Sequence, residues 1–133
     1  MGRVYHPNYL SYMECGRVEL MRGWGFSYAE TEKEEECFLP VIEAWVKYKA
    51  PAEFDDELDV ITTVTDFSFV RISFAYVVLR VKDDVVCAEG RTVLAGVDLA
   101  GEPRRLPEKL RSFLETLDLP PEKDRRRRNR IAT

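Results

Sequence analysis

One broad apolar helix pattern, followed by a block of strand patterns, limits the folds open to this sequence. Over residues 7–22 apolar side chains recur every three or four positions, so that Tyr9, Met13 and Leu20 fall on one helical face. The apolar stripe is wide, which is typical of a helix that is largely buried. Two glycines follow it, the second being Gly25, as glycines do at helix C-termini.

The next part of the chain carries strand patterns. Large apolar side chains occupy every second position of residues 70–78, and Lys82-Asp83-Asp84 is typical of a hairpin turn. Gly90 lies inside a strand pattern, which indicates a bulge or a close approach of another backbone. The predicted strands cover residues 37–49, 58–65, 70–78 and 85–97.

Two further helices are predicted around these strands. Ser27 and Glu30 have the spacing of a capping box, so a short exposed helix is expected to begin there. A second helix is predicted over residues 107–117, where Pro107 occupies the first turn. Because strands joined by short turns must be antiparallel, we predict an α+β fold in which an antiparallel sheet curls around the long helix.

Composition excludes several classes of protein. At 133 residues the chain is long enough for one domain with its own core. Its net charge of −4 argues against nucleic acid as the main partner. No apolar run approaches the roughly 20 residues that span a bilayer, so no membrane partner is expected. Three cysteines without a C-x-x-C spacing are typical of core residues in a reducing compartment, so we expect a cytoplasmic protein with no metal or cofactor.

The C-terminal end differs in charge from the rest. Five arginines lie in the last nine residues, so the preceding residues carry −9. This segment follows Pro120-Pro121 and has few apolar residues. We therefore predict one domain over residues 1–119 and a basic, disordered tail over residues 120–133.

The residues alone indicate little chemistry. His6 is the only histidine, so neither a Ser-His-Asp triad nor a multi-histidine metal site can form. It stands just before the long helix, whose free N-terminal N–H groups could hold an oxyanion. Such a site still needs a carboxylate or similar group. Glu14 precedes Arg17 by three residues, and an i,i+3 salt bridge is the default role for that spacing.

Four stretches of the sequence match, in order, the motifs of one enzyme family. The first is Gly-x-Val-Tyr-His-x-x-Tyr at residues 2–9, followed by a helix with Glu-x-x-Arg. The others are Tyr-x-x-Pro-x-x-x-Asp-Asp at residues 48–56, a long strand ending in Val-Asp at residues 90–98, and Arg-x-Leu-Pro at residues 104–107. Together they resemble the hot-dog-fold acyl-CoA thioesterases of the 4-hydroxybenzoyl-CoA thioesterase type, and within them the branch associated with the bacterial Tol-Pal envelope system.

The resemblance implies roles for residues near the start of the helix. The backbone N–H at His6 would be the oxyanion donor, Asn8 would be a further catalytic candidate, and Tyr5 and Tyr9 would contact the substrate. In this family an Asp, preceded by a first strand, acts as nucleophile or general base, and by position it would fall two residues upstream of Met1. We therefore expect the native chain to be longer. Glu14 is a second candidate, because a related branch places a Glu on the central helix.

The resemblance also implies a function. We expect an acyl-CoA thioesterase that hydrolyses a small or medium acyl-CoA to the free acid and CoA, working as a homodimer or homotetramer without a cofactor. One alternative is a non-catalytic hot-dog protein that binds acyl-CoA or acyl carrier protein. A dehydratase of the same fold is a further alternative, but that chemistry usually needs a His paired with an acid on the helix. The sequence predicts neither the acyl-chain preference nor the number of subunits.

Overall fold

The chain folds into one antiparallel sheet with a long helix across one face. The computed structural model describes residues 8–117, 119 and 127–132. Its elements are α1 (Asn8–Gly23), α2 (Tyr28–Glu35), β1 (Val41–Tyr48), β2 (Glu57–Phe67), β3 (Arg71–Arg80), β4 (Val85–Ala95), α3 (Glu108–Glu115) and β5 (Arg127–Ala132). The strands lie in the order β1-β4-β3-β2-β5, and every neighbouring pair is antiparallel.

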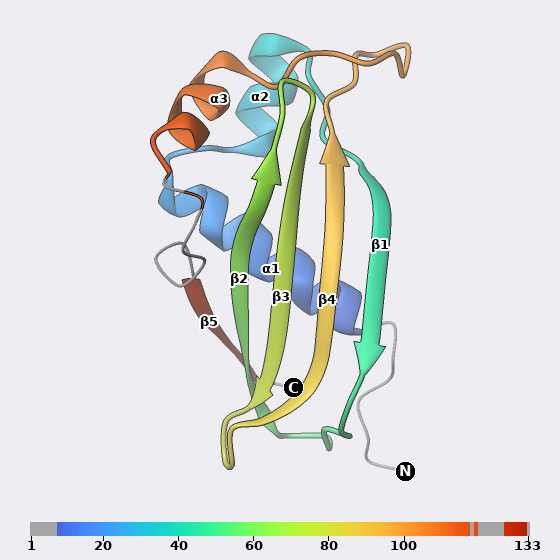
Figure 1. The fold of residues 1–133 in the computed structure, drawn as a ribbon, viewed down its shortest axis with the longest axis vertical. Helices are drawn as coiled ribbons and strands as arrows, with labels where there is room; N and C mark the ends of the chain where they lie inside the picture. The colour runs from blue at the N-terminus through green and yellow to red at the C-terminus, as the bar shows by residue number, and fades with distance from the viewer. Residues whose placement is uncertain (1–7, 118, 120–126, 133) are drawn as a thin grey trace.

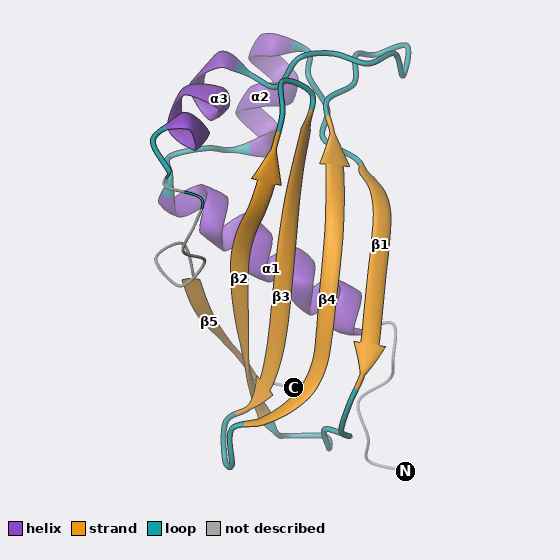
Figure 2. Ribbon diagram, in the orientation of Figure 1, coloured by secondary structure: helices purple, strands orange, loops and turns teal. Residues whose placement is uncertain are grey.

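The layers explain why one face of α1 is buried. The other face is exposed and includes Leu10, 44% exposed, so the expectation of a largely buried helix is wrong. Figure 1 shows α1 running diagonally across one face of the sheet, with α2 and α3 grouped at the end of the sheet that carries the β2–β3 turn. Figure 2 shows the same arrangement by type, with all the helices on one side of the strands. This is the α+β architecture predicted from the sequence, an antiparallel sheet around a long helix.

The helix boundaries agree with the local signals. The Ser27 side chain accepts a hydrogen bond from the backbone N–H of Glu30 at 3.5 Å, so the predicted N-cap of α2 is confirmed. Gly25 has a φ of 79°, a left-handed conformation that glycine adopts without strain, and it turns the chain out of α1. α3 begins directly after Pro107. Among the described residues, no helix is long and apolar enough to cross a lipid bilayer.

Two glycines let α1 lie close to the sheet. A β-carbon at Gly90 in β4 would collide with the side chain of Met13. A β-carbon at Gly16 in α1 would collide with Thr62 and Val60 of β2. The crowding at Gly90 therefore comes from a side chain of α1 that packs on β4, whereas the sequence pattern indicated a bulge or another backbone there.

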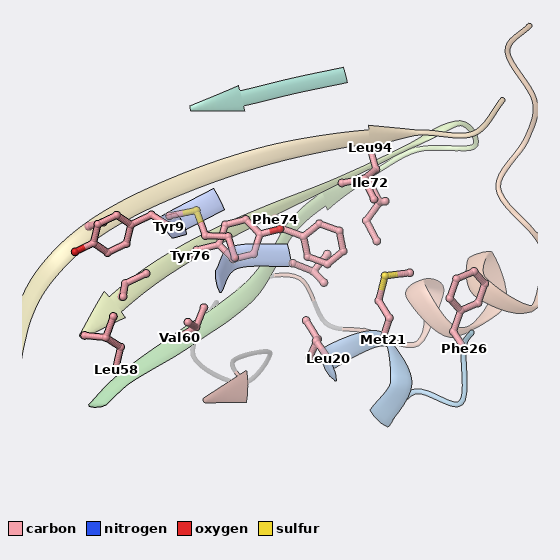
Figure 3. Close-up of a cluster of buried hydrophobic side chains, with 14 of the residues drawn as sticks. Tyr9, Leu20, Met21, Phe26, Leu58, Val60, Ile72, Phe74, Tyr76 and Leu94 are labelled. Atoms are coloured by element: carbon pink, nitrogen blue, oxygen red, sulfur yellow. The ribbon is translucent and has the colours of Figure 1, made fainter. Parts of the chain in front are cut away.

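The core lies between α1 and the inner face of the sheet (Figure 3). The helix contributes the stripe predicted from its spacing, with Tyr9, Met13 and Leu20 all buried. The strands contribute alternate residues, as the pleat of a sheet requires. Those residues include Leu58, Val60, Val64, Ile72, Phe74, Tyr76, Val78 and Leu94.

The C-terminal segment differs from the prediction. Residues 127–132 form β5, which pairs antiparallel with β2 from Thr62↔Arg127 to Glu57↔Ala132. The expectation of a tail without secondary structure is therefore wrong for these six residues. The sequence pattern could not indicate this strand because its arginines give no apolar alternation, whereas the pairing uses backbone groups. Residues 120–126 and 133 lie outside the described residues, and the boundary between residues 119 and 120 stays a prediction.

Candidate active site

The N-terminal end of α1 lies beside the end of the edge strand β1. The Tyr9 ring in the first turn of α1 is 5.7 Å from the Tyr48 ring at the end of β1, measured between centroids. It is also 5.9 Å from the Tyr12 ring, in an edge-to-face arrangement. These three rings join the helix start to the strand end, so the first turn of α1 has a fixed place beside the loop that follows β1. The first N–H groups of a helix have no partner within it and can bind an oxygen atom.

Tyr9 is a core residue of this cluster. Its side chain is 3% exposed, and burial is the main cause that raises its pKa to about 12. Tyr12 is half-buried and packs against the core, whereas Tyr48 is 47% exposed and faces the solvent beside the helix start. The sequence pattern did not indicate Tyr12 or Tyr48 as candidate site residues. The signal that could have found Tyr48 is its place as the first residue of the Tyr-x-x-Pro motif.

Asn8 and Glu14 lie on α1 at different heights. Asn8 is the first residue of α1 and is exposed. Glu14 is also exposed, and it lies about 9 Å further along the helix axis, since each residue rises about 1.5 Å. It is therefore not in the same turn as the helix start. Tyr5 and His6 lie outside the described residues.

The expected salt bridge between Glu14 and Arg17 is not among the ion pairs of the described residues. Arg17 is instead 6% exposed and turns toward the sheet. Its Nε donates to the Tyr28 hydroxyl at 3.3 Å, and a terminal nitrogen donates to the Tyr76 hydroxyl at 3.2 Å. The default interpretation of the Glu-x-x-Arg spacing was wrong for Arg17, whose partners come from α2 and β3.

The charge of Arg17 is stabilised by these tyrosines. Burial acts to lower the pKa of Arg17, but the electrostatic and hydrogen-bond contributions of Tyr76 and Tyr28 outweigh it, so the pKa lies above its usual value. Burial in turn raises the pKa of both tyrosines, and the Arg17 charge opposes that rise. The network continues to β4, because the Tyr76 hydroxyl and Thr92 Oγ1 are 2.7 Å apart. It therefore links α1, α2, β3 and β4.

One polar group beside this network is unsatisfied. Thr62 Oγ1 is buried and makes no hydrogen bond within the described residues. Thr62 lies opposite Tyr76 in the β2–β3 register and under Gly16 of α1. The small glycine leaves just enough room for the threonine side chain.

Comparison with known proteins identifies the family. A family model described as the thioesterase-like superfamily matches residues 1–114. The acyl-CoA thioester hydrolase YbgC of Escherichia coli O6:H1 (strain CFT073) is 30% identical over 110 residues, which are 82% of this chain and 81% of that protein. YneP of Bacillus subtilis (strain 168) is 36% identical over 76 residues, or 57% of this chain, and this match spans only 54% of YneP.

A solved structure agrees with this assignment. The DHNA-CoA thioesterase from Staphylococcus aureus superimposes with a TM-score of 0.78 at 29% identity, covering 86% of this chain and 76% of that one. The helix, the antiparallel sheet and the family match therefore point the same way. The chain belongs to the thioesterase-like superfamily and has its hot-dog fold.

Proposed function

We propose that this chain hydrolyses the thioester bond of a small or medium acyl-CoA, releasing the free acid and CoA. The observation that carries the proposal is the first turn of α1, which is fixed against β1 by the Tyr9–Tyr48 contact in a chain of the thioesterase-like superfamily. A thioester carbonyl receives little resonance stabilisation from sulfur. A few N–H donors and one carboxylate are therefore enough to catalyse its hydrolysis. The ordered sequence motifs support placing the chain in the branch associated with the Tol-Pal system.

We assign the roles at this site as follows. The backbone N–H at His6 polarises the carbonyl, Asn8 supports it from the first turn of α1, and Tyr5 contacts the acyl-CoA, while the buried Tyr9 holds the first turn of α1 in place. The exposed Tyr48 ring supports an acyl-binding surface there, since Tyr9 itself is largely covered. The activating carboxylate that the family resemblance implies is an Asp. Glu14 is the less favoured candidate, because it lies about 9 Å along α1 from Asn8.

We further propose a homodimer or homotetramer that pairs through β1. This strand is at one edge of the sheet, and every residue in it except Val46 is exposed. Its exposed side chains include Trp45, 47% exposed, and Ile42, 43% exposed. An exposed edge strand with apolar side chains is a template for pairing with another strand. Sedimentation equilibrium tests this: Trp45→Lys is expected to dissociate the assembly, whereas Phe54→Lys, at an exposed loop aromatic, is not.

The alternative function is binding of acyl-CoA or acyl carrier protein without hydrolysis. This binding function is favoured only if no carboxylate reaches the start of α1. Glu14 is exposed and lies about 9 Å along α1 from Asn8, which is a reason to keep the alternative. The three cysteines are free of disulfides, which supports the cytoplasm as the compartment.

The test is the rate of thiol release from a panel of aliphatic and aromatic acyl-CoA thioesters. We would compare the 133-residue chain with a variant that carries the family's Asp-containing segment fused in front of residue 1. The fused variant is expected to be at least ~10²-fold faster, because it carries a group that activates water or attacks the carbonyl. Glu14→Gln is expected to leave its rate unchanged, and Glu19→Gln on the same helix is the matched control.

Two outcomes would contradict parts of this proposal. Equal rates for the two chains, together with a large loss in Glu14→Gln alone, would move the catalytic role to Glu14. Saturable binding of acyl-CoA without hydrolysis by either chain would favour the binding protein. A Phe substitution at Tyr48 that changes KM for aromatic but not aliphatic substrates would support its contact with the acyl group.

A further inference from the structure

A cluster of arginines around an exposed phenylalanine lies at the other end of α1. Phe69, in the turn between β2 and β3, is 61% exposed. The guanidinium carbon of Arg105 is 5.4 Å from the centre of its ring, and that of Arg111 is 5.9 Å away. Figure 1 shows this turn at the end of the sheet where α2 and α3 lie, remote from the start of α1. The proposed thioesterase chemistry uses none of these residues.

Two hollows meet at this cluster. One has a volume of about 340 Å³ and is lined by Arg104, Arg105 and Arg111, among others. The other has a volume of about 310 Å³ and is lined by Phe67, Phe69 and again Arg111. Arg111 therefore borders both hollows, and three arginines line a space large enough for a small ligand.

The backbone that carries Arg104 and Arg105, and the side chain of Arg111, are held in place by the fold. The backbone N–H of Arg104 donates to the Gly96 carbonyl at 2.8 Å, and that of Leu106 donates to the Phe69 carbonyl at 2.7 Å. Arg111 Nε donates to the Leu106 carbonyl at 2.9 Å, which orients its guanidinium. A group held in one orientation loses less conformational entropy when it binds a ligand. The segment is thus preorganised.

The donors of these guanidiniums are largely unused. Within the described residues, neither Arg104, Arg105 nor Arg111 has a carboxylate oxygen within 4.0 Å, although four other ion pairs occur there. Glu35, Glu108 and Glu115 also line the two hollows. These carboxylates would repel a broad, negatively charged surface such as that of nucleic acid. A compact anion can reach the arginines between them.

We propose that this cluster binds a compact, phosphate-bearing polyanion, with Arg105 and Arg111 as its main contacts. Guanidinium groups bind phosphate oxygens through paired, charge-assisted hydrogen bonds, which a fixed fork of donors favours. The Phe69 ring makes cation–π interactions with both guanidiniums, which stabilises two positive charges close together. The site is separate from the helix start, so it is a second binding site on this chain.

The test is isothermal titration of the full chain with inorganic pyrophosphate at low and at physiological ionic strength. Saturable binding is expected, and it should weaken with salt because surface charges are screened. Arg105→Met and Arg111→Met are each expected to weaken it about tenfold or more, the loss of one charge-assisted contact. Arg22→Met removes an exposed arginine with the same change in net charge, and is expected to change nothing.

Several results decide the proposal. No saturable binding of pyrophosphate by the wild-type chain, or equal weakening by Arg22→Met, would overturn it. Arg105 is exposed, so its variant is expected to keep the wild-type melting temperature even if Arg111→Met does not. A competition arm with CoA identifies the source of the phosphates: displacement of pyrophosphate assigns them to CoA, and no displacement assigns them to another small metabolite. The titration measures no hydrolysis, so its result is independent of the thioesterase assignment.

Discussion

Replacing Thr62 by Val is expected to make this protein more stable. Thr62 Oγ1 is fully buried between α1 and β2, and it has no hydrogen-bond partner within the described residues. A buried hydroxyl without a partner loses its hydrogen bonds to water on folding and gains none in return. Valine has nearly the same shape, so it fits under Gly16 without that loss.

The magnitude follows from the cost of the unpaired hydroxyl. Leaving a buried polar group unsatisfied costs about 1–3 kcal/mol. Because Thr62 can relax slightly, we expect the free energy of unfolding to rise by about 1–2 kcal/mol. For a chain of this length each kcal/mol corresponds to about 3–5 °C in Tm. The rise in Tm should therefore be clear in thermal scans and in the midpoint of urea unfolding.

The matched control is Thr92→Val, the same substitution in β4. Thr92 is also buried on the inner side of the sheet, but its Oγ1 lies 2.7 Å from the Tyr76 hydroxyl. Removing it breaks that hydrogen bond and leaves the tyrosine with fewer partners. A loss of about 1–2 kcal/mol is expected. The two variants should thus shift the urea midpoint in opposite directions.

The outcome that refutes the reasoning is a shift of the same sign. If Thr62→Val destabilises the protein by as much as Thr92→Val, the Thr62 hydroxyl has a hydrogen-bond partner in solution. A changed urea slope in either variant would mean that the unfolded or native state itself had changed, and the comparison would fail for that reason. All measurements should be made at one protein concentration, since assembly also stabilises the fold.

Three further predictions concern α1. Arg17→Met should lower the free energy of unfolding by about 1–3 kcal/mol in urea, because buried tyrosine hydroxyls lose a charged donor; no change would contradict the network. Burial raises the pKa of Tyr9 to about 12, so on raising the pH the Tyr9 hydroxyl loses its proton in the unfolded chain before it does so in the folded protein. The contribution of Tyr9 to the free energy of unfolding is therefore present below pH 10 and is lost between about pH 10 and 12. In Tyr9→Phe the fall in stability with pH, followed by urea midpoints from pH 9 to 11, should be shallower than in the wild type. Gly90→Ala should cost about 1–3 kcal/mol by pushing Met13 aside, and Met13→Ala in the same chain should recover part of it, as a double-mutant cycle would measure.

The buried face of α1 was predictable because it depends on local spacing. Tyr9, Met13 and Leu20 repeat with the helical period, and a stripe of that kind is buried wherever the helix packs. Arg17 was not predictable in the same way. Its partners Tyr28 and Tyr76 lie 11 and 59 residues away, and a charged residue in a helix is by default assigned to solvent.

The sheet was predictable in its strands but not in their order. Residues 37–49 have the apolar content of a strand, but that pattern does not say whether the strand is central or at an edge. Burial depends on the neighbours, and β1 has only β4 beside it within the described residues. Its apolar side chains, such as Ile42 and Trp45, are therefore exposed. The arginine cluster around Phe69 was missed for a related reason, since Arg105 and Arg111 meet that ring only when the fold brings α3 beside the β2–β3 turn.

The contact between the exposed edge strand β1 and the start of α1 has a consequence for the proposed enzyme. Tyr48 ends the exposed strand β1 and also touches Tyr9 at the start of α1, so the proposed assembly surface and the proposed catalytic site share a residue. Pairing of a second copy along β1 would cover the side of the site that is open in one subunit and exclude water from it. Electrostatic stabilisation by N–H donors is stronger when water is excluded. If the assembly forms, dissociating it with Trp45→Lys should therefore lower kcat as well as molecular mass, even though Trp45 itself lies outside the site.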